Sequence, residues 1–191
     1  MPDSPAMLFI TFDDPAPARA AYQEVKELPG VRQAAVLERS DEGLLDVPES
    51  WVHGAGTPTV VSGIVGGLVG LLGGPVGVFL GWTAGTVLAG AAEIKRFQDA
   101  AEGLTVYSSG LAEGGSLLIA EVREQSPGAA DALAARHGGR LVRRPAEEVA
   151  AEVRAAQEAA EEAVREEAAR ADQEKAEQEK AEQASREDGD R

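Results

Sequence analysis

Short apolar runs of strand length alternate with helical patterns over the first quarter of the chain. Runs rich in Val, Ile, Leu and Phe, bounded by turn residues, are typical of strands. They cover Met7–Phe12, Val31–Arg39 and Leu44–Val47. After the first run, Asp14 precedes Pro15, the pattern of an N-cap followed by proline at the first helical position. We therefore expect a helix from Pro15 to about Glu27 and the order β-α-β-β.

A second set of elements follows about seventy residues later. Leu117–Val122 has the composition of a strand, Ser126-Pro127 is a helix start, and Gly138-Gly139 ends that helix. Arg140–Arg143 completes a β-α-β unit. Each half alone would expose an apolar face, so the two halves are expected to pack together. The predicted fold is α+β: a split ferredoxin-like sandwich with a four-stranded antiparallel sheet and two helices on one face.

The segment between the halves is uncharged and rich in glycine. No Asp, Glu, Lys or Arg occurs from Ser50 to Ala92, where His53 is the only titratable side chain. Small residues recur at helical spacing, which lets another helix approach closely. The predicted helix-packing residues are Gly63, Gly67, Gly70, Gly77, Gly81, Gly85 and Ala89. The helix is expected to break at Gly73, Gly74 and Pro75, giving two arms, a glycine-zipper helical hairpin.

The surroundings of this hairpin are left open by the sequence. Its first arm, Thr59–Leu72, reaches about 21 Å at ~1.5 Å per residue, against ~30 Å for a bilayer core. A single pass is excluded because both ends of the insertion join one domain. The first hypothesis is a homo-oligomeric protein of the cell membrane whose hairpin contacts lipid and whose domain faces the cytoplasm. The alternative is a soluble cytoplasmic oligomer, an interaction, shell or cargo-type module with the hairpins in its core.

The chain after Pro145 is rich in Ala and Glu and carries most of the net charge of −15. Strong helix formers run without Gly or Pro to Gly189, which predicts a long helix. Few of its residues could form a core, so the end is expected to fray into a disordered tail and could bind a protein partner. The expected divisions are 1–49 and 99–144 for the domain halves, 50–98 for the hairpin and 145–191 for the acidic helix.

Residues that could carry chemistry are few. The chain has no cysteine, and His53 and His137 lack partners at metal-ligand spacing. Asp14 is explained as a helix cap, and Ser62 and Ser108 have no base partner in the sequence. Net negative charge disfavours nucleic acid. The N-terminus has no basic, apolar leader of the signal-peptide type. We therefore expect no catalytic, cofactor or metal site, and a non-enzymatic role.

Four short pieces of the sequence resemble a known family. They are Thr11–Asp14 (TFDD), Gly66–Gly70 (GGLVG), Leu72–Pro75 (LGGP) and Gly138–Val142 (GGRLV). Over Met7–Arg144 the chain resembles the bacterial "predicted membrane protein" family known as domain of unknown function 1269. The resemblance implies a ferredoxin-like domain, a glycine-zipper hairpin and membrane association, with a structural or stress-related role and no reaction. The stretch Gly103–Glu113 departs from the family in being shorter and more polar.

Overall fold

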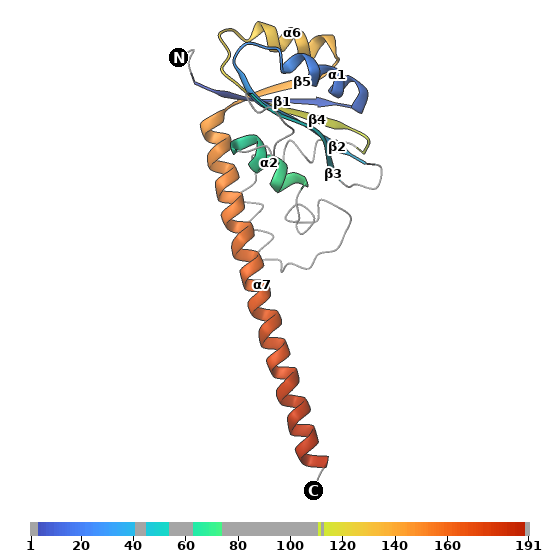
Figure 1. Cartoon of the computed structure of the whole chain (residues 1–191), viewed down its shortest axis with the longest axis vertical. Coiled ribbons are helices and arrows are strands. Elements are labelled where there is room, and N and C mark those ends of the chain that lie inside the picture. The colour runs from blue at the N-terminus through green and yellow to red at the C-terminus, as the bar shows by residue number, and fades with distance from the viewer. Residues whose placement is uncertain (1–3, 41–44, 54–62, 74–110, 112, 190–191) are drawn as a thin grey trace.

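The computed structural model describes the chain except residues 1–3, 41–44, 54–62, 74–110, 112 and 190–191. It is a mixed α/β protein built on one antiparallel sheet of five strands in the order β3-β2-β4-β1-β5 (Figure 1). The strands are β1 (Ala6–Phe12), β2 (Val31–Arg39), β3 (Leu45–Val52), β4 (Ser116–Val122) and β5 (Arg140–Pro145). The described helices are α1 (Pro15–Val25), α2 (Gly63–Gly73), α6 (Gly128–Arg136) and α7 (Ala146–Gly189).

Strand β4 lies at the centre of the sheet, and all of its residues are buried. It pairs with β2 on one side and with β1 on the other, in both cases antiparallel. Strands β1 and β2 are consecutive in sequence but not neighbours in the sheet, because β4 lies between them. The segments before and after the glycine-rich insertion therefore form one sheet.

Helix α1 starts as the sequence predicts. The Asp14 carboxylate accepts a hydrogen bond from the Ala16 amide at 2.9 Å, which confirms Asp14 as the N-cap. The helix ends at Val25, two residues before the predicted end. The turn that follows requires glycine, because Gly30 has φ +85° and a Cβ there would lie 2.3 Å from the Arg123 carbonyl oxygen.

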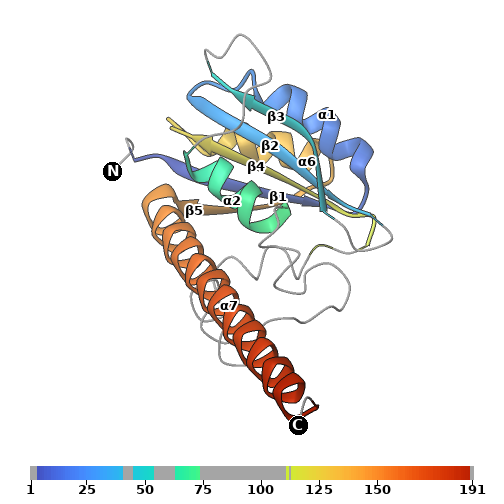
Figure 2. The ribbon, with the colours of Figure 1, turned by 60° about the horizontal axis from the view of Figure 1, so that its bottom comes forward.

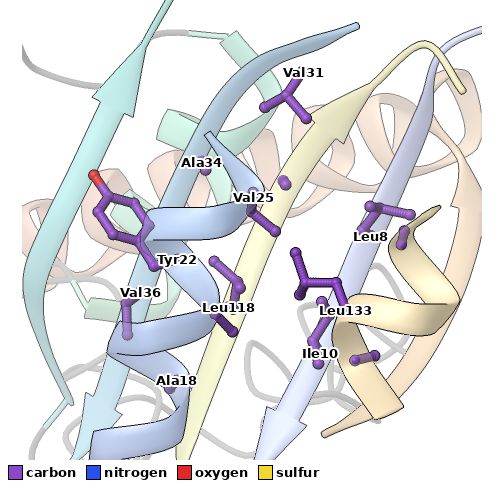
Figure 3. Close-up of a cluster of buried hydrophobic side chains, with 14 of the residues drawn as sticks. Leu8, Ile10, Ala18, Tyr22, Val25, Val31, Ala34, Val36, Leu118 and Leu133 are labelled. Carbon is purple, nitrogen blue, oxygen red and sulfur yellow. The ribbon is translucent and has the colours of Figure 1, made fainter. Parts of the chain in front are cut away.

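Helices α1 and α6 cover the same face of the sheet, as expected (Figure 1). Figure 3 shows the apolar side chains between them and the strands, among them Tyr22 and Val25 of α1, Leu133 of α6 and Leu118 of β4. α6 begins after Pro127 without a side-chain cap, so Ser126 does not cap it as expected. These contacts form the first of two cores.

The sequence predicts five strands but a sheet of four, whereas all five strands belong to one sheet. The additional member is β3, an edge strand paired with β2. It continues to Val52, beyond the predicted end at Val47, and passes through Pro48. Proline lacks an amide hydrogen, but an edge strand can place it on the side that needs no ladder hydrogen bond.

The opposite face of the sheet is also covered, which the sequence does not predict. Helix α2 and the first turns of α7 lie against it (Figure 2). The buried side chains there include Met7, Phe9, Leu117 and Ile119 of the strands. Beyond this contact, α7 runs away from the sheet as a continuous helix to Gly189 (Figure 1). Fraying of its end in solution stays a prediction.

Candidate helix-packing site

Helix α2 is the first arm of the glycine-rich segment, and it packs into the protein's own core. Val65, Leu68 and Leu71 recur every three residues and are 0, 1 and 5% exposed. Burying one such side chain stabilises a fold by about 1.5–3 kcal/mol. The cluster that receives them combines strand residues with residues of α7. This arm therefore has a protein environment within one copy of the chain.

Gly67 lies where α2 meets α7. A Cβ at this position would be 2.5 Å from Cγ1 of Val153, which is buried on α7. Real Cβ atoms do not approach this closely, so the missing side chain is what allows the two helices to come together. The packing resembles that of small-residue helix interfaces, but its partner here is another helix of the same chain.

The other two glycines predicted on this arm differ from Gly67. Gly63 begins α2 with φ +76°, and a Cβ there would lie 3.3 Å from the Gln33 amide nitrogen, so it serves the helix start. Gly70 is exposed, and a Cβ would meet nothing within 4 Å. Helix α2 ends at Gly73. The remaining predicted packing and break residues, Gly74, Pro75, Gly77, Gly81, Gly85 and Ala89, lie outside the described residues.

The start of α7 is bound firmly to the sheet. Arg144 of β5 donates two hydrogen bonds to the Glu152 carboxylate, at 2.7 and 2.5 Å, a bidentate pair. The Ala146 amide donates to the Pro5 carbonyl at 3.0 Å. Val149 and Val153 are buried one turn apart on the same helix face. These contacts hold α7 in the position from which Val153 reaches Gly67.

Two polar residues lie buried on the same face of the sheet, near the start of α2. Gln33 and Glu121 are each 7% exposed. The Gln33 amide donates to one carboxylate oxygen of Glu121 at 2.5 Å, and Arg32 donates to the other at 3.4 Å. Both side chains therefore find partners on strands β2 and β4, and neither hydrogen bond involves α2.

The histidines and the early aspartates have structural surroundings. The His137 ring lies 2.9 Å from the Glu24 carboxylate, and this hydrogen bond lowers the pKa of Glu24. His53 packs edge-on against Trp51, with ring centroids 5.8 Å apart. Asp13 pairs with Arg140 at 3.3 Å. Among the described residues, no group of three or more His, Asp or Glu side chains is placed to hold a metal ion.

A pocket of about 180 Å³ lies beside the loop between β4 and α6. Its lining is mainly apolar, with Leu28, Val122 and Ala130 among its residues, and Glu124 is its acidic member. Glu124 accepts hydrogen bonds from Arg143 at 2.8 and 3.2 Å. Arg143 also binds Asp131 of α6. The Glu124 carboxylate in the pocket therefore belongs to a structural ion-pair network.

In the part of the chain that the structure describes, no helix combines the length and the apolar composition needed to cross a membrane. Comparison with known proteins adds no relative. The chain matches no family model, no curated protein and no solved structure. The resemblance to the domain of unknown function 1269 therefore stays a prediction. The function has to be inferred from the sequence and structure of this chain.

Proposed function

We propose that this is a non-enzymatic, membrane-associated protein that self-associates through its glycine-rich segment. The observation that carries the proposal is the run from Ser50 to Ala92 without a formal charge. Within it, Gly77, Gly81 and Gly85 recur every four residues, a spacing that permits close helix contact. Lipid accepts such a segment more readily because it contains no Asp, Glu, Lys or Arg, whose charged side chains are costly to transfer from water.

The strand order supports the split ferredoxin-like arrangement. Four of the strands follow the order β5-β1-β4-β2, with helices after β1 and β4, and β3 is an added edge strand. The insertion thus leaves the sheet at its edge and returns to its central strand. Because both ends belong to one body, the segment enters and leaves the membrane on the same side.

The packing of α2 limits lipid contact to the part of the glycine-rich segment that follows it. Val65, Leu68 and Leu71 are buried against the sheet, so in this arrangement the first arm contacts protein. Membrane contact then belongs to the residues after Gly73, which include Phe79, Leu80 and Trp82. An apolar segment joined at both ends to the same folded domain suits shallow insertion better than a complete crossing.

The second candidate is a soluble oligomeric interaction module. The burial of α2 favours it, because a helix of this composition already lies in a protein core within a single copy. In that case the residues after Gly73 would pack against their equivalents in other copies. The two candidates share self-association and differ in whether lipid or protein surrounds the segment.

Fractionation of the full chain distinguishes the candidates. We expect tagged protein to float with vesicles of neutral lipid and to resist extraction by alkaline carbonate. Recovery of all protein in the soluble fraction, with a discrete oligomer by light scattering in the absence of detergent, would support the second candidate. A monodisperse monomer without detergent would contradict both.

The role of the glycine spacing is tested by a matched pair of substitutions. Gly81→Leu fills one position of the spacing, whereas Val87→Leu changes the size of a residue outside it. Self-association should weaken at least about tenfold in Gly81→Leu, because a blocked helix contact costs more than ~1.4 kcal/mol. Val87→Leu should associate as the native chain does. Equal association of the two variants would rule out the glycine contact.

A further inference from the structure

The two described ends that flank residues 74–110 lie on one face of the sheet, the face covered by α2 and the first turns of α7, here called the α2 face. Helix α2 ends at Gly73, and its Leu71 is buried in the apolar cluster on this face. Leu111 is 3% exposed in the same cluster, and its carbonyl accepts a hydrogen bond from Arg39 of β2 at 3.0 Å. The glycine-rich segment is therefore attached to the α2 face at both ends.

The opposite face of the sheet is covered by α1 and α6, whose side chains pack on the strands in the second cluster. To bring lipid to that face, residues 74–110 would have to pass around an edge of the sheet. The α2 face is consequently the side of the domain nearest to any membrane that this segment contacts.

Helix α7 projects from the same side of the domain. Its first turns pack on α2, where Val153 lies against Gly67, and the Arg144–Glu152 ion pair holds them to the sheet. From there α7 runs away from the sheet on the α2 side (Figures 1 and 2). The part after Glu162 alone extends about 40 Å at ~1.5 Å per residue. A lipid surface that approaches the α2 face therefore meets α7 as well.

The charge of α7 determines which lipid surfaces allow this approach. The helix contains 15 acidic and six basic residues, a net charge of −9 out of −15 for the whole chain. Two of its arginines pair with glutamates one turn earlier in the same helix, Arg165 with Glu161 and Arg170 with Glu166. Anionic headgroups repel such a helix over a Debye length of about 10 Å at 0.1 M salt, whereas a zwitterionic surface has no net charge to repel it.

We propose that the α2 face is the side of the domain that meets the membrane, and that α7 restricts this contact to lipid surfaces without net negative charge. The lipid class is zwitterionic, as in phosphatidylcholine. The inference rests on the proposed function and adds to it the orientation of the domain and the kind of lipid.

The orientation is tested with single thiols, since the native chain contains no cysteine. Gly70→Cys labels α2 and Ala132→Cys labels α6, and both positions are exposed. Each full-length variant carries an environment-sensitive fluorophore and is mixed with phosphatidylcholine vesicles that contain a headgroup spin label. Quenching should be stronger for the label at residue 70. Equal quenching at the two positions, or stronger quenching at residue 132, would overturn the orientation.

The lipid class is tested by reversing charge on α7 at constant length. Glu158 and Asp172 are exposed on this helix. At low salt the native chain should bind phosphatidylglycerol-rich vesicles at least about tenfold more weakly than phosphatidylcholine vesicles, and high salt should reduce the difference. The double variant Glu158→Lys, Asp172→Lys should show a smaller difference. The control Glu158→Asp, Asp172→Glu keeps both charges and should behave as the native chain does.

The outcomes separate this inference from the function on which it rests. A native chain that floats equally well with both kinds of vesicle, or a charge-reversed variant with the native preference, would overturn the role of α7 and leave membrane association intact. A native chain that floats with neither kind of vesicle would contradict both the proposed function and this inference.

Discussion

Two glycines of α2, one helical turn apart, differ in whether the structure leaves room for a side chain. At Gly67 a methyl group would collide with Val153, a branched side chain with restricted rotamers, whereas at Gly70 it would meet no atom. We expect Gly70→Ala to raise the free energy of unfolding by about 0.5–1 kcal/mol, because alanine favours the helix. Gly67→Ala should be less stable than Gly70→Ala by about 1–3 kcal/mol, the usual cost of overpacking. Urea denaturation of both variants measures the difference.

The comparison contains its own control, since both changes add one methyl group to the same helix. Gly67→Ala should cost less stability in a Val153→Ala background than in the native chain, because the smaller residue at 153 removes the collision. Equal stability of the two single variants would show that α2 does not pack on α7 at Gly67.

Tyr22 provides a prediction at high pH. Burial raises the pKa of its hydroxyl from the ordinary value of 10.0 to about 12, and the nearby Glu49 adds to the effect. The folded state therefore keeps the neutral phenol where the unfolded chain has lost its proton. Stability from this group is complete below pH 10 and is lost as the pH rises toward 12. Between pH 9 and pH 11.5, the free energy of unfolding of the native chain should fall by on the order of 1–2 kcal/mol more than that of Tyr22→Phe.

Urea denaturation at a series of pH values measures this difference between the two proteins. Phenylalanine keeps the ring in the apolar cluster of Figure 3 and removes only the titrating hydroxyl. Parallel alkaline loss of stability in the two proteins would contradict the raised pKa of Tyr22.

Among the elements, α7 divides into a packed part and an exposed part. Ala146, Val149, Val153 and Ala156 are buried, and Ala159 is partly buried against the same cluster. In a chain that ends after Glu162, the free energy of unfolding should lie within about 0.5 kcal/mol of the native value, because most side chains described beyond that residue, such as Arg165 and Asp172, are exposed. A chain ending after Pro145 should lose about 3–6 kcal/mol, because two buried valines each contribute about 1.5–3 kcal/mol. Thermal unfolding of both shortened chains checks this; an equal loss would show that the far part of α7 is also packed.

The sequence is informative about elements that have a distinct period and clear ends. Strand β2 has the predicted bounds, and β1 and β4 are each one residue longer at the start. The Asp14 cap is confirmed because its chemistry is local. The extent of β3 is not predictable from Pro48, since only the position of the strand at the sheet edge makes proline acceptable there.

The position of α2 is the part of the site that the sequence could not supply. Its apolar residues predict a helix that avoids water, but lipid, a second copy and the chain's own sheet all satisfy that requirement. The contact of Gly67 with Val153 is what places α2 on the chain's own sheet, and these two residues are far apart in the sequence. The thin stripe of Val149 and Val153 in an otherwise charged helix was the available signal, although by itself it resembles a weak coiled-coil seam.

At the scale of the molecule, α7 gives the protein an elongated shape (Figure 1). Its 44 residues extend about 66 Å at ~1.5 Å per residue, and the part after Glu162 accounts for about 40 Å. Ion pairs four residues apart, such as Glu161 with Arg165, stabilise this exposed part and weaken as salt is added. In X-ray scattering at low salt, ending the chain after Glu162 should shorten the maximum dimension by on the order of 40 Å.

A maximum dimension unchanged by that truncation would mean that the far part of α7 folds back or is disordered. Circular dichroism at low and at high salt separates these two outcomes, since only the disordered form loses the helical signal.

The central place of β4 has a consequence for the order of events during synthesis. Strands β1, β2 and β3, and the whole glycine-rich segment, are synthesised before Ser116–Val122. Until then β1 and β2 have no strand to join them, and α2 has no complete sheet to cover. Domains generally fold once their chain has emerged, so closure of this sheet waits for the second half. The uncharged segment is therefore synthesised before the sheet that buries α2 can form.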